Sequence, residues 1–282
     1  MIAHMTAALL AALAPMQQAD TTFAVDAGDR LEVSQLEGVV EVKTWDRAEM
    51  RVIAVYDEEE GRLDVRSSGG TVHVAAKGEW GEPVYGELEI SIPRSMALEI
   101  TGVSLEVTIE GSAGDATVST VEGSILLAGG SGNIALNAVD GDVTLSVASG
   151  KITINAVDGD VSISESSGAI AVTAVDGDVT LDGIDSDNVS VNSVDGDIGY
   201  EGTISDGGRY VLSTHDGDLD VLIPDGANAR ISIDTFSGDL DTDFPVELEG
   251  DFGKKRISFT VGTGKALVEL SAFDGTISLR QD

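Results

Sequence analysis

Residues 141–158 read GDVTLSVASGKITINAVD, and this pattern decides the fold because it recurs along the centre of the chain. Glycine returns every nine residues from Gly114 to Gly177, resumes at Gly196 after one extra residue, and then spaces out to Gly217 and Gly238. Each unit reads Gly-x-[Val/Ile]-x-[Val/Ile/Leu] followed by a short polar stretch. A fixed short period of this kind indicates a repeat architecture.

Apolar and polar residues alternate within each unit, which predicts a short β-strand with one face inward. The turns between strands are too short for a crossover helix, so a doubly wound parallel sheet is excluded. We expect the following side chains to point inward: Val143, Leu145, Ile152, Ile154, Val161, Ile163, Ile170, Val172, Val179 and Leu181. We expect Thr144, Thr153, Ser162, Ala171 and Thr180 to point outward.

The units are of two alternating kinds, so the true period is eighteen residues. One kind follows Val-Asp, as at Asp140 and Asp158, and the other follows Ser, as at Ser149 and Ser167. Two strands and two corners make one coil of a flattened parallel β-solenoid, whose coils stack at about 4.8 Å. Antiparallel hairpins in a meander or barrel are the rival interpretation, but they give no reason for like positions to recur at every second strand.

An asparagine ladder is predicted at one phase of the coil. Asn137, Asn155 and Asn192 share that phase, and Thr173 replaces Asn once. Stacked amides hydrogen-bond up and down a stack, and we expect them to satisfy buried polar groups in this way.

Aspartates form two predicted columns at the Val-Asp-Gly corners. Stacked carboxylates about 5 Å apart repel one another, so Ca²⁺ held between coils, as in calcium-binding β-rolls, or hydrogen bonds from backbone N–H groups must offset the repulsion. The repeat units lack the complete Gly-Gly-x-Gly-x-Asp pattern of those rolls, and we therefore expect turn hydrogen bonds with only weak divalent cation binding. The weak cation candidates are Asp140, Asp158, Asp176 and Asp195 in one column and Asp142, Asp160, Asp178 and Asp197 in the other.

Composition narrows the choice of partners. The net charge is −34, with 42% apolar and 4% aromatic residues and no cysteine. Nucleic acid and anionic membrane surfaces are disfavoured because both need a basic footprint, whereas cations or a basic partner are favoured. The absence of cysteine excludes disulfides, cysteine-based metal sites and the lipid-bearing cysteine of a lipoprotein.

The chain divides into three predicted parts. Residues 1–19 contain the apolar run MTAALLAALAPM at 5–16, which indicates a secretory signal peptide; an ordinary N-terminal helix is the alternative. Residues 20–98 form an N-terminal β segment and cap, and residues 99–282 form the solenoid. No other stretch is long and apolar enough for a transmembrane helix.

No catalytic or cofactor site is predicted. The three histidines, at positions 4, 73 and 215, include no pair with metal-ligand spacing. His215 beside Asp216 and Asp218 admits a metal or acid-base interpretation, but we favour a tolerated repeat substitution. Nucleophile elbows, phosphate loops and dinucleotide fingerprints are absent from the sequence.

Four stretches resemble a bacterial family of exported β-strand-repeat proteins that are labelled adhesins without an established function. They are LEVSQLEGVVEVKTWD at 31–46, ISIPRSMALEI at 90–100, LIPDGANARISIDTFSGDL at 222–240 and LVELSAFDGTISLR at 267–280. The resemblance implies a right-handed parallel β-solenoid, or β-helix, here with about 18–21 residues per coil. It also implies an envelope location, and it brings no catalytic residues.

Together these observations predict an exported, non-catalytic protein of the bacterial periplasm or cell surface, adhesive or structural, whose partner is a surface ligand or another envelope protein. The alternative is a periplasmic accessory protein of envelope sensing or stress response that binds another envelope protein.

Overall fold

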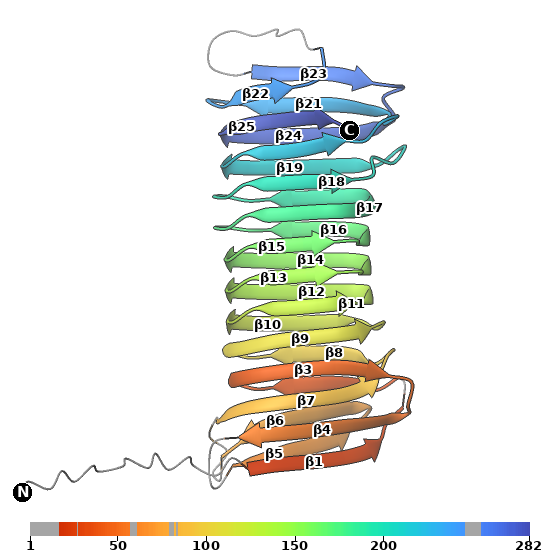
Figure 1. Ribbon diagram of the computed structural model, residues 1–282, viewed down its shortest axis with the longest axis vertical. Helices are drawn as coiled ribbons and strands as arrows, with labels where there is room; N and C mark the ends of the chain where they lie inside the picture. The colour runs from red at the N-terminus through yellow and green to blue at the C-terminus, as the bar shows by residue number, and fades with distance from the viewer. Residues whose placement is uncertain (1–16, 27, 57–60, 79–81, 83, 246–254) are drawn as a thin grey trace, which may run out of the picture.

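The computed structural model of the protein describes residues 17–26, 28–56, 61–78, 82, 84–245 and 255–282. Within these ranges the chain forms 25 strands and no helix, which confirms the all-β prediction, and the strands build one long stack (Figure 1). The signal peptide predicted over residues 1–19 lies outside the described residues except for its last positions, where β1 (Gln17–Ala24) begins.

The centre of the stack has two faces, and the chain alternates between them. One face contains β8 (Ala97–Thr101), β10 (Ala116–Glu122), β12 (Ser131–Asp140), β14 (Ser149–Asp158), β16 (Ser167–Thr173), the end of β17 (Val179–Asn192) and β19 (Arg209–Asp216). The other contains β9 (Ser104–Ser112), β11 (Ile125–Gly129), β13 (Val143–Ser146), β15 (Val161–Ser164), the start of β17, β18 (Ile198–Gly202) and β20 (Leu219–Ile223).

Each central strand pairs parallel and in register with the next strand of its face. Ile152 lies between Ile134 and Ile170, so like positions are 18 residues apart. The offset becomes 19 where β17 passes a bulge between Asp185 and Asn188, and 21 in the following coil. This register confirms stacked parallel strands and excludes an antiparallel meander in the centre of the chain.

Each corner needs glycine for two reasons: the backbone has a positive φ there, and it lies against the backbone of the neighbouring coil. Gly159 has φ +129°, and a Cβ there would lie 2.6 Å from the carbonyl oxygen of Gly141 in the neighbouring coil. Gly150, at the opposite corner, has φ +105° and would place a Cβ 2.4 Å from the Gly132 oxygen. Only glycine tolerates such dihedral angles and such an approach, which explains the nine-residue glycine period.

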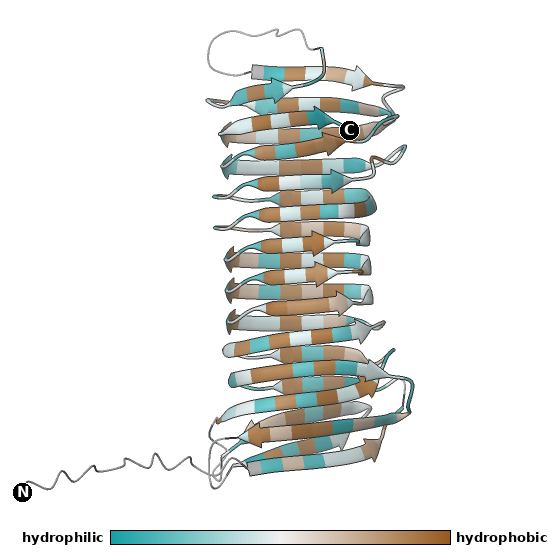
Figure 2. Cartoon of the chain, viewed as in Figure 1, coloured by the Kyte–Doolittle hydropathy of each residue, from teal (hydrophilic) through white to brown (hydrophobic). Residues whose placement is uncertain are grey.

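The core is a thin aliphatic column between the two faces. All ten side chains predicted to point inward are buried, whereas Ser162, Ala171 and Thr180 are exposed and Thr144 and Thr153 are half-buried. Brown bands alternate with white or teal ones along the central strands in Figure 2. The two faces leave room for branched aliphatic groups between them, which accounts for the low aromatic content.

The asparagine ladder exists, but its expected role is wrong. Asn155 Nδ2 donates to Asn137 Oδ1 at 2.8 Å, and Asn137 Nδ2 donates to Ser119 Oγ at 3.2 Å. Asn155 is exposed and Asn137 is half-buried, so the ladder satisfies no buried polar group. The reason is alternation: each Asn follows an inward residue such as Leu136 or Ile154 and therefore points outward.

At the N-terminal end, stacking order departs from chain order. β2 (Arg30–Ser34) lies between β6 (Thr71–Lys77) and β8, and β3 (Glu37–Trp45) lies between β7 (Tyr85–Pro93) and β9. β4 (Glu49–Tyr56) pairs antiparallel with β7 and with β1, and β5 (Arg62–Ser68) pairs antiparallel with β6. Antiparallel strands thus cover an end that would otherwise present unpaired backbone from the parallel stack.

The C-terminal end repeats this arrangement. β24 (Ala266–Asp274) lies between β19 and β21 (Ala229–Thr235), and β25 (Thr276–Gln281) lies between β20 and β22 (Asp239–Thr242). β23 (Lys255–Val261) pairs antiparallel with β21 on the outside. At both ends, a coil from the end of the chain is therefore held between two layers formed by other segments.

The inward position of Ile163 generates a stability prediction. Its side chain is fully buried, so Ile163→Asp places an unpaired charge in the core and lowers the free energy of unfolding by about 4 kcal/mol or more. Ser162→Asp, one residue away and exposed, changes it by about 0.5 kcal/mol. Chemical denaturation of both variants is the measurement, and equal losses would show that the alternation is misassigned.

Candidate binding surfaces

One edge of the stack carries the Val-Asp-Gly corners, and we call it the acidic corner edge. It lies at the left of Figure 1, where β10, β12 and β14 end and β11, β13 and β15 begin. The residue before each corner glycine is a carboxylate that pairs in parallel register with its counterpart in the next coil. This outer carboxylate row consists of Glu122, Asp140, Asp158, Asp176, Asp195, Asp216 and Asp274.

The residue after each corner glycine forms a second row with a different environment. Asp160 Oδ1 accepts the backbone N–H of Asp178 at 2.9 Å, and Asp178 Oδ1 accepts that of Asp197 at 2.8 Å. The same bond joins the other coils of this turn-bonded row, which consists of Asp142, Asp160, Asp178, Asp197 and Asp218. Hydrogen bonds from N–H to a carboxylate are strong, and they offset the repulsion within this row.

The outer carboxylate row lacks such support in its middle. Asp140, Asp158, Asp176 and Asp195 make no side-chain hydrogen bond or ion pair with any residue that the structure describes. The structure therefore brings the eight candidate aspartates together as two separate rows, one on either side of the corner glycines. Among the described residues no group of three or more His, Asp or Glu is arranged to hold a metal ion, and weak cation binding by these rows stays a prediction.

An exposed apolar side chain occupies the position before the outer carboxylate in most coils, with His215 there before Asp216, a feature that the sequence reasoning missed. The exposed fractions run from 40% at Val103 to 53% at Val194. Backbone bonds between neighbouring coils fix these positions; for example, the Val157 carbonyl accepts the Asp176 N–H at 2.8 Å. This apolar ridge consists of Leu36, Val103, Val121, Val139, Val157, Val175, Val194, Phe273 and Phe236.

Three rings stack at the C-terminal end of the apolar ridge. Phe273 lies between Phe236 and His215, with ring centroids 4.7 Å and 4.6 Å away. His215 occupies the ridge position of its coil, and its Nδ1 is 3.7 Å from Asp216 Oδ2. Its ring is thus part of an aromatic stack, an arrangement that fits the favoured reading of a repeat substitution. The sequence signal for the ridge is the Val of each Val-Asp-Gly corner.

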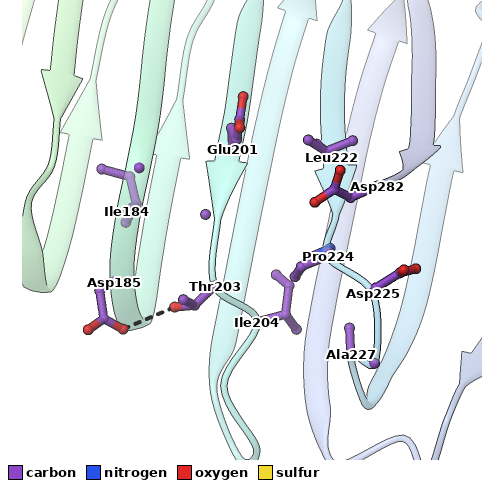
Figure 3. Close-up of a pocket in the computed structure, with 13 residues that line it drawn as sticks. Ile184, Asp185, Glu201, Thr203, Ile204, Leu222, Pro224, Asp225, Ala227 and Asp282 are labelled. Carbon is purple, nitrogen blue, oxygen red and sulfur yellow. Dashed lines mark hydrogen bonds between the residues drawn. The ribbon is translucent and has the colours of Figure 1, made fainter.

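The opposite edge carries an open groove of about 500 Å³ near the C-terminal end. Figure 3 shows that it combines apolar side chains, among them Ile184, Ile204 and Leu222, with the carboxylates of Asp185, Glu201 and Asp225. Asp185 Oδ1 accepts the Thr203 hydroxyl at 3.2 Å, and Asp225 accepts the Gln281 amide at 3.1 Å. The described lining contains no Lys, Arg or His, and the Thr203 hydroxyl and two of the carboxylates are occupied by hydrogen bonds within the fold.

Basic residues form ion pairs with carboxylates on strands and turns towards the two ends. Arg51 binds Asp20 at 2.7 Å and lowers the pKa of that carboxyl group through the hydrogen bond. Lys265 binds Asp206 at 2.5 Å with the same effect on its pKa. Arg30 with Glu99 and Arg209 with Glu269 are further pairs. The middle of the acidic corner edge is one part of the described surface where a continuous row of carboxylates has no cationic partner.

Comparisons with known proteins give one strong match. The family model described as Toastrack DUF4097 matches residues 29–280. No curated protein matches the sequence significantly. Within the described residues no helix is long and apolar enough to span a bilayer.

The solved structures that match the chain are distant in sequence. A candidate adhesin from Parabacteroides merdae is 11% identical, with a TM-score of 0.35 over 93% of this chain and 96% of that one. A candidate lipid-binding protein from Parabacteroides distasonis is 13% identical, with a TM-score of 0.34 over 93% and 96%. A candidate cell adhesion protein from Clostridium sporogenes is 11% identical, with a TM-score of 0.28 over 95% and 100%.

The two carboxylate rows predict losses of stability that differ in size for substitutions only two residues apart. Asp160→Ala removes the acceptor for Asp178 N–H and lowers the free energy of unfolding by about 1 kcal/mol. Asp160→Asn keeps a hydrogen-bond acceptor and removes a repelling charge, so it lowers the free energy of unfolding by less than Asp160→Ala does. Asp158→Ala, in the outer row, is the matched control and costs no more than about 0.5 kcal/mol. Urea unfolding of the three variants checks this, and a loss in Asp158→Ala equal to that in Asp160→Ala would contradict it.

Chelation tests the role of cations separately. Because backbone N–H groups already bond the turn-bonded row, the protein is expected to stay folded in EDTA at physiological salt. Millimolar Ca²⁺ is expected to raise the melting temperature only modestly, by screening and weak binding. Thermal unfolding followed by circular dichroism is the measurement. Unfolding on chelation and cooperative refolding on addition of Ca²⁺ would show that a structural metal is required.

Proposed function

Because the chain belongs to the Toastrack DUF4097 family, we propose that it is an exported, non-catalytic bacterial protein of the envelope or cell surface that binds a partner along its acidic corner edge. The observation that carries this proposal is the apolar ridge beside the uncompensated outer carboxylate row. A surface of this kind, repeated from coil to coil, suits contact with an extended partner rather than turnover of a small substrate.

The proposal includes finer features of the chain. We propose that the coils are right-handed, with about 18–21 residues each, as is usual for a strand that returns to the same sheet in parallel. The division into a signal peptide at 1–19, a cap at 20–98 and a solenoid at 99–282 belongs to the same proposal, although its second boundary falls within β8. The proposal of a non-catalytic role rests on the sequence, which carries no nucleophile elbow, phosphate loop or dinucleotide fingerprint.

A second function shares this surface. A periplasmic accessory protein of envelope sensing or stress response would use the same edge to bind another envelope protein. Fractionation of native cells distinguishes the two functions. Access of externally added protease or antibody supports a cell-surface role, and recovery in the soluble periplasmic fraction supports the accessory role. Recovery in the cytoplasm would contradict the proposal of export.

Export predicts a processed N-terminus. Sequencing the native protein is expected to place the first residue between Pro15 and Thr22. Since β1 pairs with β4 from Gln17 opposite Tyr56, a cut before Gln17 preserves the whole antiparallel pairing. A cut after Ala19 removes three of its positions, which we expect to lower the melting temperature slightly. Recovery of Met1 in the native protein would overturn the prediction.

A further inference from the structure

We propose that the apolar ridge and the outer carboxylate row together bind a cationic amphipathic α-helix of a partner protein, laid along the axis of the stack. This inference rests on the proposed binding function and names the chemistry of its partner. The ridge presents one apolar side chain per coil over consecutive coils. Exposed apolar surface of this length marks a contact site on a soluble protein.

The coil itself does not require apolar residues at this position. Turn corners normally carry Asp, Asn, Ser or Gly, and the structure accommodates His215 in the same place. Exposed residues at the opposite corner show no such bias, since Val147 and Glu165 share one phase there. Stacking therefore explains the small buried residues and glycines of the acidic corner edge, but it does not explain its exposed valines.

Charge complementarity predicts that the partner is positively charged. Each central ridge residue is followed by an outer carboxylate, as Val139 is by Asp140 and Val157 by Asp158, and the carboxylates from Asp140 to Asp195 have no cationic neighbour among the described residues. A basic partner gains charge-assisted contacts along this row. A second copy of the chain, whose net charge is −34, brings like charges together, and an anionic lipid surface does the same.

Repeat spacing selects a helix over an extended segment. Ridge residues recur at about 4.8 Å along the stack, and successive turns of an α-helix advance by about 5.4 Å. The mismatch of about 0.6 Å per coil is small enough for side chains to absorb over several coils. An extended segment places same-face residues about 6.7 Å apart and loses register within two coils. A helix of 20 residues, about 30 Å long, covers about six coils.

The aromatic end of the ridge is the expected anchor of the complex. Phe236 and Phe273 remain 48% and 45% exposed although their rings stack on each other. Large aromatic side chains contribute much of the binding energy at protein interfaces, whereas the valines provide complementary surface. We therefore expect the apolar stripe of the partner helix to extend over Phe273.

The test uses the full mature chain and a designed 21-residue peptide with leucines on one helical stripe and lysines beside it. Two control peptides replace the lysines by glutamates or the leucines by serines. The ridge variant is Val139→Ser/Val157→Ser/Val175→Ser, the charge variant is Asp140→Asn/Asp158→Asn/Asp176→Asn, and the anchor variant is Phe273→Ser. Leu126→Ser and Glu106→Gln, exposed on a flat face, are the matched controls. Titration calorimetry measures affinity and circular dichroism measures peptide helicity.

The expected result is binding with a gain of peptide helicity, weakened at least tenfold in the ridge, charge and anchor variants and unchanged in both matched controls. If the ridge variant binds the peptide as tightly as the unmodified protein, or if the serine peptide binds as tightly as the leucine peptide, binding depends on net charge alone and the proposal is wrong. Binding without a gain of helicity would overturn the choice of a helix. Binding to phosphatidylcholine vesicles is measured in parallel for all variants. If the unmodified protein binds these vesicles and only the ridge variant fails to bind them, the ridge is a lipid-binding surface instead. Each of these failures leaves the proposal of export, tested by fractionation, intact.

Discussion

Backbone contact between corner glycines is the constraint on which the rest of this structure depends. Gly159 approaches the Gly141 carbonyl so closely that a Cβ would lie 2.6 Å from its oxygen, and the same contact recurs from coil to coil. Coils that meet in this way share one register, so every side chain lies over its counterpart. Substitutions at these glycines therefore act on two coils at once, through the dihedral angle and through the clash.

In-register stacking repeats both favourable and unfavourable interactions. It buries a continuous aliphatic column, with Ile152 between Ile134 and Ile170, and it also aligns carboxylates in rows. The turn-bonded row is compensated because each carboxylate accepts an N–H of the next coil, while the middle of the outer row has no partner. The surface that we propose for binding is thus a consequence of the repeat, because one corner residue becomes a ridge when it is stacked.

The ends of the stack follow a different principle. A parallel coil has an open edge on each side, and repetition alone never closes it. Here the first and last coils of the chain lie inside the stack, and β1, β5 and β23 add antiparallel strands outside them. Segments distant in sequence must meet before either end is complete, so we expect the ends to form late in folding.

The sequence by itself determined the strand period, the inward and outward faces and the alignment of the aspartates, because a local nine-residue rhythm encodes all three. Resemblance in sequence also indicated the family, which the match over residues 29–280 bears out. Only the tertiary structure decided that β2 and β24 are inserted between layers, because non-local pairing leaves no periodic signal. It also decided that the corner valines are exposed. A valine that recurs in a repeat is predicted to be buried, and only the geometry of the corner shows that these valines point outward.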